Sequence, residues 1–249
     1  MLQKEHIHPG ELEERIAEQI QFLINKSKVQ NYNLLAYVKF LNDKKEEALE
    51  NLQKAEETVP VEYPGDVEKK SLITWGNYAW VHYHMGNLTE SQTYMKKVES
   101  ICKQLGSASS YKMELPQIYC DKGWSLLKFG SRYYEKAKES FEKALEKEPK
   151  NPEFNSGYAI TVYRLEDHFA KKPSELSLEP LRLAVKLNPD DVFVVPLLAM
   201  KLQEINKMKE GENYIKEALQ KHPDIPYILR FPKRRYEECF CKVFISEKV

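Results

Sequence analysis

The feature that most constrains this chain is a pattern of small and large residues that recurs about every 34 residues, the period of the tetratricopeptide repeat. In each copy a Gly, Ala or Ser lets two antiparallel helices approach closely, and large neighbours fill the remaining space. The copies fall at 32–55, 75–98, 123–149, 151–189 and 198–223. Five copies in register predict an all-α tetratricopeptide-repeat superhelix, a right-handed α-solenoid of about five helical hairpins.

We expect three parts along the chain. Residues 1–10 form an N-terminal leader, residues 11–231 form the repeat superhelix, and residues 232–249 form an atypical C-terminal tail that follows no repeat register.

Proline and glycine mark where the helices should break. A first helix is predicted over residues 11–27, after a break at Pro9. The segment 57–69, which contains Pro60, and the segment 165–177 interrupt the repeat register. We therefore expect both segments to be surface loops.

The charge balance gives no overall attraction for polyanions. The chain has 38 basic and 38 acidic residues, so a protein that binds them must gather its positive charge on one surface. No apolar stretch is long enough to span a bilayer, and the N-terminus lacks an apolar signal core. We expect a cytoplasmic protein that binds neither membranes nor DNA.

Residue patterns of catalysis are missing from the sequence. The 6 histidines lie in no motif with a nucleophile or with metal-ligand spacing, and the 4 cysteines form no Cys-x-x-Cys pair. The 9 glycines form no phosphate-binding loop. We expect no enzyme, no cofactor and no metal, and any phosphate must be bound by side chains.

Two cations lie inside apolar helical runs. Lys128 lies near the end of the run 123–129, and Arg164 lies near the end of the run 157–165. Such a cation must reach water, pair with a carboxylate or bind an anionic ligand, because an unpaired buried charge is costly. Trp124 lies one helical turn before Lys128 and offers a surface on which a base can stack.

The same residues also allow a purely structural interpretation. Lys128 and Arg164 can pair with neighbouring acids such as Glu153 or Glu166, while Trp124 simply packs in the core. Spacing alone leaves both interpretations open.

Several segments are similar in residue identity, as well as in repeat spacing, to the interferon-induced proteins with tetratricopeptide repeats. They are residues 32–38, 74–80, 83–86, 122–128, 141–146 and 157–165. The likeness runs from about Glu11 to Phe231, roughly the first half of a family member. It implies a non-enzymatic antiviral effector of the cytosol. Such a protein captures the 5′ end of foreign single-stranded RNA, with a triphosphate or a cap lacking 2′-O-methylation.

The resemblance also implies roles for individual residues. The implied phosphate contacts are Arg15, Gln19, Lys128, Arg164 and Arg230. The implied base or cap contacts are Leu23, Trp124, Tyr134, Glu153, Tyr227 and Phe231. Arg15 resembles the capped-RNA branch, and Phe231 stands where the family usually has Tyr.

After Phe231 the resemblance gives way to Pro232 and an unrelated tail. We expect the loss of the C-terminal half to weaken RNA binding. A further possibility is that the unrelated tail marks a truncated or alternatively read product with little activity. The alternative from another class is a protein-interaction scaffold of the same family that does not bind RNA 5′ ends. Its partners would be other family members, in homo- or hetero-oligomers, since the resemblance implies that family members associate. Repeat grooves of this kind also often hold peptides.

Overall fold

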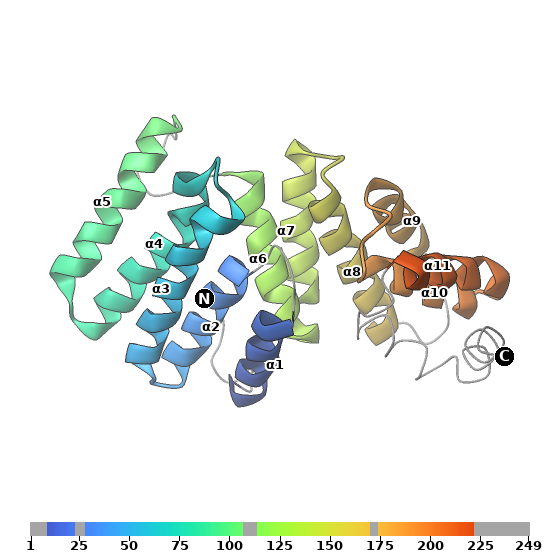
Figure 1. Cartoon of the computed structure of the whole chain (residues 1–249), viewed down its shortest axis with the longest axis horizontal. Helices are drawn as coiled ribbons and strands as arrows, with labels where there is room; N and C mark the ends of the chain where they lie inside the picture. The colour runs from blue at the N-terminus through green and yellow to red at the C-terminus, as the bar shows by residue number, and fades with distance from the viewer. Residues whose placement is uncertain (1–8, 23–27, 107–113, 170–173, 222–249) are drawn as a thin grey trace. The chain divides into compact units, whose positions relative to one another are not determined.

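The structure, a computed structural model, describes residues 9–22, 28–106, 114–169 and 174–221. These residues form helices joined by short connections and contain no strand, so the all-α prediction is confirmed for them (Figure 1). The chain divides into two compact units, which we describe separately. Unit 1 ends at Asp121, and unit 2 begins at Lys122.

Unit 1 contains two of the predicted hairpins. Its helices are α1 (Pro9–Phe22), α2 (Lys28–Leu41), α3 (Lys45–Glu62), α4 (Val67–Met85), α5 (Leu88–Gln104) and the first part of α6 (Pro116–Lys128). Helices α2 and α3 pack as one hairpin, and α4 and α5 pack as the next. The small residues Ala36 and Ala48 let α2 and α3 approach, and Leu52, Tyr78 and Val81 complete this core.

Unit 2 continues the same pattern. After α6 come a 3₁₀ turn η2 (Ser131–Tyr133), α7 (Tyr134–Lys147), α8 (Pro152–Phe169), α9 (Leu178–Leu187), α10 (Val194–Glu204) and α11 (Met208–Lys221). Gly211 of α11 shows why the repeat needs a small residue. A Cβ atom there would lie 2.7 Å from the carbonyl oxygen of Ala199 on α10, so a larger residue would push the two helices apart.

The turns inside three hairpins use a left-handed residue. Asp43, Gly86 and Asn206 follow α2, α4 and α10, with φ of 60°, 83° and 62°. Glycine reaches this region without strain, and Asp and Asn reach it more easily than other residues. The chain therefore reverses within a few residues at each of these turns.

Three expected boundaries are wrong. Pro9 begins α1 instead of preceding it, because the first helical position needs no N–H partner. Helix α3 continues through Pro60 to Glu62, and the full burial of Val59 holds this last turn on the core. Helix α8 extends through Glu166, which is buried rather than part of a surface loop. Residues 23–27, 170–173 and 222–249 lie outside the described residues.

No described helix has both the length and the apolar character needed to cross a membrane. The predicted leader and C-terminal tail lie almost wholly outside the described residues, so their boundaries stay predictions.

Candidate functional site

The structure describes the side chains of only some of the predicted site residues. Five have described side chains, all in unit 2: Trp124, Lys128, Tyr134, Glu153 and Arg164. Arg15 and Gln19 lie on α1, but their side chains are not among those described. Leu23, Tyr227, Arg230 and Phe231 lie outside the described residues.

The ring of Phe141 organises the first three helices of unit 2. Phe141 of α7 is fully buried, and it lies against Gly123 of α6 and Gly157 of α8. Trp124 meets the same ring edge to face, with ring centres 5.4 Å apart. Trp124 is half-buried, so it packs against the core while part of its surface stays accessible.

Arg164 and Tyr134 form the clearest candidate for anion binding. The guanidinium carbon of Arg164 lies 6.0 Å from the centre of the Tyr134 ring, a cation–π contact between α8 and the start of α7. Arg164 is exposed, and no carboxylate among the described residues forms an ion pair with it. A guanidinium held beside an aromatic face keeps N–H donors on its edge for a phosphate.

Lys128 occupies the last turn of α6 and is half-buried. Burial lowers the pKa of its amine to about 8. The amine therefore begins to lose its charge only slightly above neutral pH. A nearby anion would favour the charged form and raise this pKa again.

Glu166, which the sequence offers as a partner for Lys128 or Arg164, pairs with Lys201 instead. The two charged atoms lie 2.6 Å apart, and both side chains are buried. Burial alone would raise the pKa of Glu166, but hydrogen bonds from Lys201, Ser174 and Ser177 lower it overall. Sequence reasoning missed Lys201, although this lysine also sits inside an apolar run, residues 194–202.

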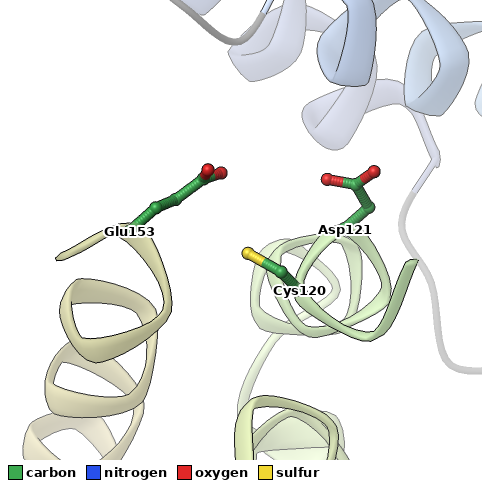
Figure 2. A group of neighbouring side chains, drawn as sticks. All are labelled: Cys120, Asp121 and Glu153. Atoms are coloured by element: carbon green, nitrogen blue, oxygen red, sulfur yellow. The ribbon is translucent and has the colours of Figure 1, made fainter. Parts of the chain in front are cut away.

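Glu153, the other acid offered as a partner, lies in the first turn of α8 and is exposed. Its backbone N–H donates to the side chain of Asn151, which caps the helix. Figure 2 shows the Glu153 carboxylate extended away from the helix. The figure also labels Cys120 and Asp121 of unit 1, where Asp121 accepts hydrogen bonds from Gln30 and Gln117.

Comparisons with known proteins show what the chain is similar to. The family model for the tetratricopeptide repeat matches residues 73–105 and 116–151. Human protein IFIT1 homolog B is 51% identical over 91% of this chain, and the human antiviral innate immune response effector IFIT1 is 49% identical over the same share. The chain is a homologue of the interferon-induced proteins with tetratricopeptide repeats. It spans about half the length of these relatives, 48% in both cases.

Solved structures of IFIT1 share the fold. The IFIT1 dimer with PPP-AAAA has a TM-score of 0.80 and 46% identity over 92% of this chain and 50% of its own. A monomeric IFIT1 mutant with Gppp-AAAA has a TM-score of 0.85 and 46% identity over 92% of this chain and 51% of its own. The predicted resemblance to the interferon-induced proteins and the tetratricopeptide-repeat fold are thus confirmed.

Proposed function

We propose that this chain binds the 5′ end of single-stranded RNA, with a triphosphate or a cap lacking 2′-O-methylation. The observation that carries the proposal is the exposed Arg164 guanidinium beside the Tyr134 ring. It lies in a chain homologous to IFIT1, a protein solved with PPP-AAAA and with Gppp-AAAA. Arg164 has the geometry of a phosphate ligand, since a guanidinium fork matches two phosphate oxygens.

The other residues singled out in the sequence have roles that the resemblance implies. Lys128 supplies a compact second charge, and Arg15, Gln19 and Arg230 add further phosphate contacts. Trp124 offers a ring on which the first base or the cap can stack, as single-stranded RNA binding requires. The Glu153 carboxylate accepts hydrogen bonds, which suits the N–H groups of guanine. Leu23, Tyr134, Tyr227 and Phe231 are proposed base or cap contacts on the resemblance alone.

The proposed activity is binding without catalysis. A role in antiviral defence is suggested by the name of the relative IFIT1, and a cytosolic location is the expectation from the sequence. Partners would be RNA 5′ ends and, in oligomers, other family members.

The test is a titration of one labelled RNA sequence with a 5′-triphosphate, a cap or a 5′-hydroxyl, at two salt concentrations. The wild-type chain should prefer the phosphorylated or capped ends and lose affinity as salt increases. Arg164→Ala should weaken binding of the triphosphate RNA by about tenfold, as expected for a charge-assisted bidentate contact. Arg182→Ala is the matched control. It removes the same charge from α9, where Arg182 pairs with Glu210 at 2.7 Å.

The result that contradicts the proposal is equal binding of all three RNA ends, or equal behaviour of Arg164→Ala and Arg182→Ala. Binding of protein partners unaffected by Arg164→Ala or Lys128→Ala would then favour the scaffold alternative.

A further inference from the structure

Two polar contacts join α8 to α10 inside unit 2. Glu166 accepts a hydrogen bond from Lys201 at 2.6 Å, and the hydroxyl of Tyr163 lies 3.5 Å from a carboxylate oxygen of Glu204. Tyr163 and Glu166 are buried on α8. Arg164 lies between them in the sequence but is exposed, against Tyr134. The turn that carries Arg164 is therefore attached to α10 through its buried side.

Glu166 is the centre of this attachment. Besides Lys201, its carboxylate accepts hydrogen bonds from the hydroxyls of Ser174 and Ser177 and from the backbone N–H of Ser177. Lys201 also donates to Glu204 at 3.2 Å. One carboxylate thus joins α8 both to α10 and to the segment that enters α9.

A buried ion pair of this kind contributes little to stability compared with apolar residues of similar volume, because both charges lose their hydration. The ion pair instead fixes the position of one helix relative to the other. Apolar surfaces tolerate small shifts of one helix along another, whereas a carboxylate with four donors has one good position. A buried polar contact that fixes the register of packed helices is the best-attested role of such groups.

We propose that Glu166 and Lys201 are positioning residues, which fix the register of α8 on α10 and thereby place Arg164 for the 5′ phosphate of the RNA. This inference rests on the proposed function. It goes further, because it assigns RNA affinity to two buried residues that cannot touch the RNA themselves.

The test replaces the pair by apolar residues in the double variant Glu166→Leu/Lys201→Met. This variant should keep its helical circular dichroism and a cooperative melt, because neither charge of the pair is left unpaired, although it should melt at a lower temperature since the buried Ser177 loses its acceptor. Its affinity for 5′-triphosphate RNA should fall about fivefold, since the bidentate contact depends on position. In an Arg164→Ala background the same double change should cause no further loss, because the pair acts through Arg164.

The control is a second ion pair of unit 2, between Lys221 and Asp190, which is also 2.6 Å long but exposed. The variant Asp190→Asn/Lys221→Met should bind RNA like the wild type. If the double variant at the buried pair fails to fold, Glu166→Asp keeps the charge and shortens its reach, and it is measured in the same two backgrounds.

Two outcomes overturn the inference. Equal losses with and without Arg164 would show a general structural effect, and unchanged affinity with Arg164 present would show no positioning role. If Arg164→Ala alone leaves the affinity unchanged, the proposed function fails together with the inference. If Arg164→Ala weakens binding but the pair has no effect, only the inference fails.

Discussion

Gly157 of α8 lies directly against the ring of Phe141 on α7, where a Cβ atom on the glycine would come within 2.2 Å of a ring carbon. Gly123 of α6 meets the same ring, with a corresponding distance of 2.8 Å. Since Phe141 is fully buried, its ring has little room to move aside. The packing of α6, α7 and α8 therefore depends on two positions without side chains.

Gly157→Ala should lower the free energy of unfolding by about 1–3 kcal/mol, the usual range for overpacking a core. Urea denaturation followed by circular dichroism measures this change. Gly76→Ala is the matched control, because Gly76 lies inside α4 and a Cβ there meets nothing within 4 Å. That change should raise the free energy of unfolding by about 0.5–1 kcal/mol through helix propensity. Similar effects at both glycines would show that the close approach to Phe141 is unimportant.

Tyr134→Phe and Tyr134→Ala separate the ring of Tyr134 from its hydroxyl. The phenylalanine variant keeps an aromatic face for Arg164, so its affinity for 5′-triphosphate RNA should stay within about twofold of the wild type. The alanine variant removes about 0.5–1 kcal/mol of cation–π stabilisation, which corresponds to about a two- to fivefold loss. Fluorescence anisotropy with labelled RNA gives both values. An equal loss in the two variants would assign the effect to the hydroxyl.

RNA affinity should fall as the pH rises through about 8, because the Lys128 amine, with its pKa lowered to about 8 by burial, then loses its charge. The phosphate groups at the RNA 5′ end stay ionised between pH 7 and 9. Titrations at pH 7, 8 and 9 measure the effect. Lys128→Met should bind more weakly at pH 7 and show a flatter pH dependence. A wild-type affinity that is constant over this range would remove Lys128 from the phosphate site.

The free energy of unfolding of the RNA-free protein should rise as the pH increases, whereas the RNA affinity falls. Because the pKa of Lys128 is lowered from its usual 10.5 to about 8, the unfolded chain binds more protons than the folded chain between these values. This group therefore makes the free energy of unfolding rise with pH across that window. Urea denaturation of wild type and Lys128→Met at pH 8 and 10 isolates the contribution of this lysine.

Glu13 should stabilise unit 1 at neutral pH and lose this effect in acid. Burial alone would raise the pKa of Glu13, but hydrogen bonds from Lys39 at 2.6 Å and Asn42 at 2.9 Å lower it overall. The stabilisation is thus present above the unfolded pKa of about 4.5 and is lost as the pH falls through the lower folded value. Glu13→Gln should cost about 1–2 kcal/mol at pH 7 and little in strong acid.

Hydrogen exchange of the α1 amides measures this local stability, and Glu14→Gln serves as the control because Glu14 is exposed on the same helix. If the two variants exchange alike at pH 7, the contacts of Glu13 with α2 contribute nothing.

The repeat period predicted the helical hairpins because the pattern of small and large residues reports packing directly. Gly123 and Gly211 are needed where the structure places another helix against them. Boundaries were harder to predict, because Pro60 is a local signal for a break and tertiary burial of Val59 outweighs it. No local pattern in the sequence contains that information.

The candidate site was predictable only in part. Lys128 and Arg164 stood out as cations in apolar runs, and the resemblance added Tyr134, which the structure places beside Arg164. Lys201 has the same local pattern and was missed. Its partner Glu166 lies 35 residues away in sequence, so only the packing of α8 on α10 shows which cation is buried and paired.

The two thiols of unit 1 offer a further use of the structure. Cys102 and Cys120 are both fully buried, and burial raises the pKa of the Cys102 thiol, so alkylating reagents reach and react with these sulfur atoms only when the surrounding helices separate. Pulse alkylation followed by peptide mass spectrometry would thus time the opening of α5 and of the start of α6 in the unmodified protein. The two buried cysteines can therefore report the kinetics of helix opening without any engineered thiol.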